Sequence, residues 1–445
     1  MTDGRPVDQS APVPQTANPA DASRARWAWV APEVWTARML TALEQGVKGG
    51  RWYTLMDKVA ALPTLWAAFA RVKANRGAAG VDHVTVAMYE RRLDANLTAL
   101  ATALQTGTYR PQPIRRHWIP KLGTRQQRPL GIPTVRDRVV QTAVRLVLEP
   151  IFEVAFADHS YGFRPRRGAK DALRRVDRLR RAGYVHVVDA DLQSYFDSIP
   201  HAPLRARVES KISDGRVLAL LDAFLQQPIF EGLAQWTPEE GTPQGAVISP
   251  LLANLYLDPL DQAMAAAGYE MVRYADDLVV LCRTAADAVQ ALALLQRWTT
   301  AAGLRLHPTK TRVVDAQQPG GFDFLGYHFE RGYRWPRAKS VKKLRTTLRP
   351  KTRRTYGQSL AVVIEDVNRV LRGWFEYFKH SHPRAFRPID GWVRMRLRSI
   401  LRHRQGRDGR GRGFDHRQWP RRFFEEQGLF SLVTAHASLR QSCTR

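Results

Sequence analysis

The chain has 445 residues, of which 44% are hydrophobic and 25% charged, so it is long enough for two or three packed domains. Its 69 Lys and Arg residues outnumber its 41 Asp and Glu residues, and the resulting net charge of +28 favours a polyanionic partner such as nucleic acid. Two cysteines are too few for a structural zinc site or a disulfide framework. Because the sequence has neither an apolar run of about 18 residues nor a signal-peptide pattern, we expect a cytoplasmic protein without a membrane partner.

Positive charge is concentrated in the last quarter of the sequence. Residues 331–445 contain 29 basic and 8 acidic residues, a net of +21, whereas residues 1–330 contain 40 and 33, a net of +7. The same stretch contains four tryptophans, which a disordered tail seldom carries: Trp335, Trp374, Trp392 and Trp419. We therefore predict a folded nucleic-acid-binding region there.

The first 183 residues are predicted to form a tail, a helical region and a hairpin region. Residues 1–30 are predicted to be a disordered tail, because they begin with a stretch rich in Ala, Pro, Thr and Asp that has no apolar period. Residues 31–105 show a helical period broken by a glycine-containing turn at residues 75–80. Within residues 106–183, two extended segments at 115–121 and 127–133 predict a hairpin with a basic tip.

An amphipathic helix is expected after Asp137. Its apolar positions step by three and one, which leaves Arg138, Gln141 and Arg145 on the opposite face. Beyond residue 355 the helical period returns, and residues 402–412 are predicted to be a flexible basic loop because three glycines interrupt them.

Carboxylates follow two predicted strands. A short apolar run at residues 184–188 leads to Asp189 and Asp191, and a second hairpin carries Asp276 and Asp277 at its tip. If neighbouring strands bring Asp191, Asp276 and Asp277 together, their mutual repulsion calls for cations, and oxygen ligands of this kind suit Mg²⁺. Two such ions can activate an attacking 3′-hydroxyl and stabilise a leaving pyrophosphate. The competing interpretation is an exposed acidic pair that only solvates a turn.

Seven sequence blocks in a fixed order decide between these interpretations. They are Arg128-Pro129-Leu130-Gly131-Ile132-Pro133-Thr134, Ser160-Tyr161-Gly162-Phe163-Arg164-Pro165, Asp191-Leu192-Gln193-Ser194-Tyr195-Phe196-Asp197, Gly241-Thr242-Pro243-Gln244-Gly245, Tyr274-Ala275-Asp276-Asp277, Gly303-Leu304-Arg305-Leu306-His307-Pro308-Thr309-Lys310-Thr311 and Phe324-Leu325-Gly326-Tyr327. From about Trp35 to the C-terminus the chain resembles the reverse transcriptase/maturases encoded by group II introns. One block alone could arise by chance, whereas the ordered series is specific.

The resemblance implies roles for individual residues. Asp191, Asp276 and Asp277 correspond to the metal-binding catalytic acids, and Phe196 corresponds to the aromatic residue that excludes a 2′-hydroxyl. A core aromatic is the alternative for Phe196. Gln244 resembles a contact to the incoming nucleotide or the templating base.

Three basic residues resemble further substrate contacts. Lys121 and Arg128 match residues that clamp the triphosphate, a task that an Arg fork and a mobile Lys charge suit. Lys310 matches a positioning residue of a later block. In a chain this basic, the alternative for each of them is general attraction of a nucleic-acid backbone.

A segment near the C-terminus resembles the maturase region called domain X. Its signature is Leu371-Arg372-Gly373-Trp374-Phe375-Glu376-Tyr377-Phe378-Lys379-His380-Ser381. Because Trp374, Phe375 and Phe378 share one helical face, we expect them in the core. RNA contacts are expected from the basic face, at Arg369, Arg372 and Lys379.

The resemblance implies an α+β right-hand polymerase with a small antiparallel palm sheet and a helical thumb. The expected regions are a tail (1–30), an N-terminal helical extension (31–105), fingers (106–183), palm (184–330), thumb with domain X (331–400) and a basic DNA-binding region (401–445). Since only one cysteine lies near the end, we expect the class without the C-terminal endonuclease domain.

The expected function is RNA-directed DNA synthesis with two Mg²⁺ ions, coupled to splicing and mobility of a group II intron RNA. The expected partners are that intron RNA, an RNA template, a DNA primer or target and dNTPs, in a bacterial-type cytoplasm with association to the nucleoid during mobility. The alternatives are a maturase that only assists splicing, and a related reverse transcriptase recruited to defence or diversity generation without an intron.

Overall fold

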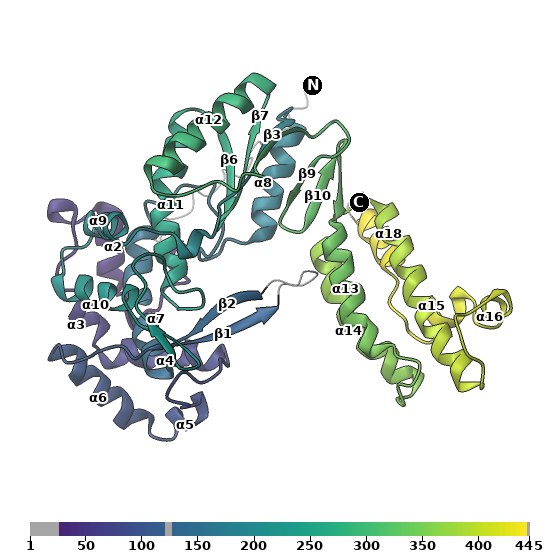
Figure 1. The fold of residues 1–445 in the computed structure, drawn as a ribbon, viewed down its shortest axis with the longest axis horizontal. Coiled ribbons are helices and arrows are strands. Elements are labelled where there is room, and N and C mark those ends of the chain that lie inside the picture. Colours follow the sequence, from purple (N-terminus) through teal and green to yellow (C-terminus); the bar gives the residue numbers. More distant parts are fainter. Residues whose placement is uncertain (1–25, 121–126, 443–445) are drawn as a thin grey trace, which may run out of the picture.

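The computed structural model describes residues 26–120 and 127–442 (Figure 1). Lys121 and the first 25 residues of the predicted tail therefore lie outside the described residues. The boundary of that tail at residue 30 is too late, because Trp27 and Val30 are buried in the core with only 4% and 9% of their surface exposed.

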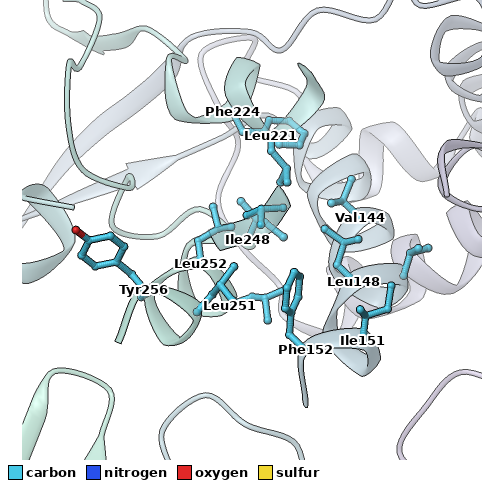
Figure 2. Packing of buried hydrophobic residues seen from close by; sticks show 14 of the residues in the cluster. Val144, Leu148, Ile151, Phe152, Leu221, Phe224, Ile248, Leu251, Leu252 and Tyr256 are labelled. Atoms are coloured by element: carbon cyan, nitrogen blue, oxygen red, sulfur yellow. The ribbon is translucent and has the colours of Figure 1, made fainter. Parts of the chain in front are cut away.

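A helical body surrounds the long helix α7 (Val135–Glu153). Its other helices are α2 (Ala37–Gln45), α3 (Met56–Val59), α4 (Leu62–Ala74), α5 (Val86–Glu90), α6 (Leu93–Gln105), α9 (His201–Glu209) and α10 (Gly215–Leu225). The Thr134 side chain caps α7 by accepting a hydrogen bond from the backbone N–H of Asp137 at 3.2 Å. Figure 2 shows side chains of α7, α10 and α11 (Ser249–Ala266) packed into one apolar cluster.

Arg138 and Gln141, on the predicted polar face of α7, are buried, and Arg145 on the same face is partly exposed. Arg138 donates to the carbonyl of Ala78 at 2.7 Å, and the fully buried Gln141 accepts from the backbone N–H of Val247 at 2.8 Å. The helical period correctly predicted the helix. It could not show that neighbouring loops would cover the polar side as well.

The predicted basic hairpin forms half of a four-stranded sheet, which we call the hairpin sheet. The order of its strands is β2 (Gln127–Ile132), β1 (Ile114–Pro120), β4 (Ile229–Glu231) and β5 (Ala234–Trp236). β1 pairs with β2 in antiparallel fashion and with β4 in parallel. The first pairing confirms the predicted hairpin.

A second sheet carries the acidic residues, and we call it the acidic sheet. Its order is β6 (Glu270–Tyr274), β7 (Asp277–Cys282), β3 (His186–Asp191) and β8 (Arg312–Asp315), with every neighbouring pair antiparallel. Alternate side chains pack on α11 and α12 (Ala285–Ala301) on one face and on α8 (Ala169–Arg181) on the other. Figure 1 shows these helices on the two sides of the sheet. Both layers hold the strand ends in fixed positions.

A small sheet and a group of helices complete the chain. The small sheet has the order β11 (Tyr333–Pro336), β10 (Tyr327–Glu330) and β9 (Phe322–Phe324). The C-terminal helical unit comprises α13 (Ala338–Lys351), α14 (Leu360–Phe378), α15 (Arg387–Arg404), α16 (Gly413–Gln418), α17 (Arg421–Glu426) and α18 (Leu432–Ser442). In Figure 1 this unit stands apart from the helical body, and the small sheet lies between α8 and α13.

The C-terminal helical unit has one core of its own. Leu348 of α13, Leu371 of α14 and Leu397 of α15 share it with Trp419 and Phe424 from the last part of the chain. The predicted loop at residues 402–412 begins later than expected, since Arg402 and Arg404 still belong to α15. Helices and mainly antiparallel sheets together confirm the α+β class, and no helix in the described ranges is long and apolar enough to cross a bilayer.

Candidate functional site

Three carboxylates meet at one end of the acidic sheet. Asp191 ends β3 and is the register partner of Asp277, which begins β7, while Asp276 lies in the turn between β6 and β7. Asp191 and Asp276 are 85 positions apart in the sequence, and the pairing of β3 with β7 brings them together. This convergence is the one that the sequence predicted.

Electrostatics at this end of the sheet are unfavourable without a cation. Burial raises the pKa of Asp277 to about 7, and the neighbouring charges of Asp189, Asp276 and Asp191 contribute to this rise. Burial, followed by the charge of Asp191, also raises the pKa of Asp276. Hard oxygen donors whose ionisation is opposed in this way suit a divalent cation, which would offset the repulsion. In residues 26–120 and 127–442, however, no three carboxylate, His or Cys groups are already arranged as a complete ligand set.

Lys310 provides one positive charge at these acids. Its ammonium lies 2.6 Å from the Asp191 carboxylate, and both side chains are partly exposed. The preceding segment is held against the end of β3, because the His307 N–H donates to the carbonyl of Asp191 at 2.7 Å. The structure therefore brings Lys310 to the acids.

Asp189 is a fourth acid on the same face, to which the sequence reasoning gave no role. Burial raises its pKa to about 6, and its nearest cation is Arg312, its register partner on β8, at 3.4 Å. The spacing of Asp189 and Asp191 indicates that both side chains lie on one face of the sheet, because residues two apart on a strand share a face.

Phe196 lies directly beyond the acids in a short 3₁₀ turn, η2 (Tyr195–Asp197). Its half-buried ring packs edge-to-face against Phe163, with centroids 6.3 Å apart, and against the buried Tyr195 at 5.5 Å. Its carbonyl accepts a hydrogen bond from the Thr242 N–H at 2.6 Å. The ring is therefore partly core and partly open, which is compatible with both interpretations of this residue.

Gln244 joins the hairpin sheet to the region of the acids. Its carbonyl accepts from the Gly131 N–H at 2.6 Å, and its side-chain amide donates to Asp197 at 3.1 Å. The adjacent Gly245 has φ +106°, and a Cβ there would lie 2.4 Å from the Gly131 carbonyl, so only glycine allows this close approach. Gln244 also lines a cavity of about 360 Å³.

Arg128, on β2, acts electrostatically on Asp276 and on Asp197. It is exposed, and its charge partly counteracts the burial that raises the pKa values of Asp276 and Asp197. Its predicted companion Lys121 lies outside the described residues.

The predicted RNA contacts share one face of α14, but acids share that face with them. Arg369 lies 3.4 Å from Glu365, and Lys379 lies 2.8 Å from Glu376. Arg372 is exposed and stacks over the Phe430 ring at 5.4 Å. The face is therefore a mixed-charge stripe rather than a purely basic one. On the opposite face of α14, Phe375 and Phe378 are at least nine-tenths buried, as expected, whereas Trp374 is only partly buried.

A cavity of about 760 Å³ lies where α8, the turn between β10 and β11, the end of α14 and α18 meet. Five cations and one anion line it: Arg180, Arg181, Arg334, Lys379, Arg440 and Asp177. The exposed Tyr333 ring lies against His382, with centroids 4.7 Å apart. Burial, followed by neighbouring cations, lowers the pKa of His380. Basic groups beside an open ring suit a nucleic-acid strand.

Convergent acids on a small antiparallel sheet, a basic hairpin beside them and a separate basic helical unit define a nucleic-acid polymerase of the right-hand type. Comparisons with known proteins support the assignment to the nucleic-acid polymerases. Residues 119–329 match the reverse transcriptase (RNA-dependent DNA polymerase) family, and residues 341–419 match the maturase-specific domain of group II introns.

Two curated relatives extend this match. Protein YkfC of Escherichia coli is 34% identical over 293 residues, which cover 57% of this chain and 76% of YkfC. The group II intron-encoded protein LtrA of Lactococcus lactis is 40% identical over 169 residues, which cover 38% of this chain and 28% of LtrA. Among solved structures, telomerase from Candida albicans with a telomeric RNA fragment is 13% identical, covering 70% of this chain and 63% of that chain with a TM-score of 0.41.

The chain belongs to the group II intron reverse transcriptase/maturases. This confirms the predicted right-hand polymerase fold and the predicted class of RNA-directed DNA polymerase with a role in intron splicing and mobility. The reverse transcriptase region implies dependence on a divalent metal ion, and the maturase region implies RNA as a partner.

Proposed function

We propose that this protein copies RNA into DNA at the acidic sheet and holds its own intron RNA with the C-terminal helical unit. The observation that carries the proposal is the convergence of Asp191, Asp276 and Asp277 at one sheet end, where burial and mutual repulsion call for cations. We assign the residues around this end to fingers (106–183) and palm (184–330). The thumb with domain X (331–400) and a DNA-binding region (401–445) follow.

In this proposal Asp191, Asp276 and Asp277 hold two Mg²⁺ ions. Bound Mg²⁺ would activate the primer 3′-hydroxyl and stabilise the pyrophosphate that leaves. Lys310 is in contact with Asp191 at 2.6 Å, so it limits repulsion among the acids before substrate arrives. Its exposed ammonium can also attract the triphosphate.

The remaining proposed contacts orient the nucleotide. Arg128 offers its planar fork of donors to the triphosphate, together with Lys121. Gln244 contacts the base pair from the loop that is bonded to Gly131. Phe196 presents the open part of its ring to the sugar and excludes a 2′-hydroxyl by its volume, which selects dNTPs over rNTPs.

Intron RNA is proposed to bind along the stripe of Arg369, Arg372 and Lys379 and to continue into the 760 Å³ cavity that Lys379 also lines. Phosphates would replace Glu365 and Glu376 as partners of these cations. A base could stack on the exposed ring of Tyr333. The RNA template, the DNA primer or target and dNTPs complete the proposed set of partners.

A primer-extension assay tests the proposal. The purified protein should extend a DNA primer on an RNA template with dNTPs and Mg²⁺, and EDTA should stop the reaction. A protein that binds RNA tightly and assists splicing but never extends a primer would instead be a maturase without polymerase activity.

A further inference from the structure

A single buried arginine connects the parts of the proposed polymerase site. Arg273, on β6, has none of its surface exposed, and its Nε donates to Asp261 of α11 at 2.7 Å. A second nitrogen, Nη2, forms an ion pair with the other oxygen of Asp261. Nη1 donates at 3.0 Å to the Asn254 side-chain oxygen and at 3.0 Å to the carbonyl of Ala275. One guanidinium thus donates to four acceptor atoms, which only the Arg fork can do.

The Ala275 carbonyl belongs to the residue that precedes the catalytic Asp276. Ala275 has φ +60°, in the left-handed region that a residue with a Cβ seldom adopts, so its conformation is strained and persists only because neighbouring groups hold it. The bond from Arg273 is one such restraint. The backbone of Gly162 is another, because a Cβ at Gly162 would lie 2.2 Å from the Ala275 nitrogen.

The turn that contains Gly162 is fixed by the same network. The Asn254 amide donates to the carbonyl of Gly162 at 2.8 Å, and the Tyr161 N–H donates to the carbonyl of Arg273 at 2.9 Å. The next residue, Phe163, also has a positive φ, +57°, and 44% of its surface is exposed. Its ring stands edge-to-face on Phe196 at an interplanar angle of 79°.

We propose that Arg273 is a positioning residue that sets Asp276 directly and sets the Phe196 ring through Asn254 and Phe163. This inference rests on the proposed function, since it assigns Asp276 to catalysis and Phe196 to sugar selection. A buried ion pair adds little to stability compared with apolar packing, so a four-bonded Arg273 is better explained by the geometry that it enforces. One network therefore links the rate of polymerisation to the choice of sugar.

The first test uses Asn254→Ala, which removes both the acceptor for Arg273 and the donor to Gly162. In single-nucleotide extension we expect kcat/KM for dNTPs to fall about 10- to 100-fold, because small displacements of reacting groups are costly. The ratio of dNTP to rNTP use should fall as well. Asn368→Ala is the matched control, since Asn368 also bridges two backbone groups, Gly428 and Phe430, but far along the chain in the C-terminal helical unit.

The second test separates sugar selection from folding. Phe163→Ala removes an exposed ring and should lower the dNTP to rNTP ratio about 2- to 10-fold, the worth of one aromatic pair, with the thermal midpoint unchanged. Phe414→Ala, at another exposed phenylalanine, is the control and should change neither quantity.

A third variant, Arg273→Lys, keeps the positive charge but loses the fork of donors. It should lower kcat by a larger factor than it changes KM.

Failure of the proposed function and failure of the positioning role give different results. If the wild-type protein does not extend primers, both the proposed function and this inference fail. If it extends primers, but folded Asn254→Ala, Arg273→Lys and Phe163→Ala proteins keep the wild-type sugar ratio, the positioning role is overturned and the polymerase assignment stands. A simple loss of stability would lower dNTP and rNTP use equally, so it cannot imitate a changed ratio.

Discussion

The acidic sheet and the C-terminal helical unit use charge in opposite ways. At the sheet, charges are half-buried or buried, carboxylate pKa values are raised, and a buried arginine restrains the backbone beside them. On the helices, Arg369 and Lys379 are paired with acids three or four residues away on the same exposed face. Such exposed pairs contribute little free energy, so breaking them to bind another anion costs little. Catalysis needs an unfavourable charge arrangement held in place, whereas binding a long polyanion needs accessible charge.

The largest expected effect comes from removing one acid of the sheet. Asp191→Asn deletes a proposed metal ligand and should lower primer extension by about 10³-fold or more, because the bound ions would no longer stabilise the transition state. Steady-state extension by the purified protein measures this, with the exposed Asp94→Asn as the control. Near-normal extension by Asp191→Asn would remove the acids from catalysis.

Sugar selection should change by a smaller factor. Phe196→Val shortens the side chain that we place against the 2′ position, and the preference for dNTPs over rNTPs should fall about 10- to 100-fold. Competition between the two nucleotides in single-nucleotide extension measures the ratio. An unaltered ratio would identify Phe196 as a core aromatic only.

The repulsion at the acids also predicts a pH-dependent stability. The pKa of Asp277 is about 7 in the folded protein, above its ordinary value of 3.8, so the folded state binds the proton more tightly than the unfolded chain. Stability therefore decreases as the pH rises from about 4 to about 7, by at most about 4 kcal/mol for this group.

Without divalent ions, Asp277→Asn should raise the melting temperature at pH 8 and have little effect at pH 4. Mg²⁺ should stabilise the wild-type protein at pH 8 more than the variant, and equal stabilisation of both would contradict a metal site here.

The smallest effect concerns single charges of the C-terminal helical unit. Truncation at residue 400 would remove Trp419 and Phe424 from a shared core, so point substitutions are the cleaner probe. Arg410→Gln with Arg417→Gln should reduce the slope of log affinity against log salt by about 0.7 to 0.9 for each phosphate that the variant no longer binds. The same change at Arg38 and Arg51, in the less basic part of the chain, is the control. Equal slopes in both variants would mean that the C-terminal charge makes no special interaction with nucleic acid.

The sequence predicted those features that depend on periodicity and on ordered blocks. The helical period gave α7 and α14, and the acids at strand ends gave the convergence of Asp191 with Asp276 and Asp277. It did not predict that β4 and β5 join the hairpin sheet, because each has three residues and shows no clear alternation. Short strands are specified by their tertiary neighbours.

Side-chain pairings were the other feature that was not predicted from the sequence. The basic residues of α14 were correctly placed on one face, but their pairing with Glu365 and Glu376 was overlooked although the spacing of three and four residues indicates it. The role of Arg273 could not be predicted, since its partners Asp261, Asn254 and Ala275 meet only after the sheet packs on α11. Spacing along the chain carries no information about such an interaction.

In the proposed mechanism, polymerisation and splicing assistance use separate parts of the molecule. The most direct measurement compares primer extension on an unrelated template with splicing of the intron RNA, for Asp276→Asn and for the triple variant Arg369→Ala, Arg372→Ala and Lys379→Ala. We expect Asp276→Asn to splice normally while its extension falls by about 10³-fold, since holding an RNA requires binding groups and not metal ligands. The triple variant should splice poorly and still extend. If both activities fall together in each protein, the division of labour between the acidic sheet and the C-terminal helical unit is wrong.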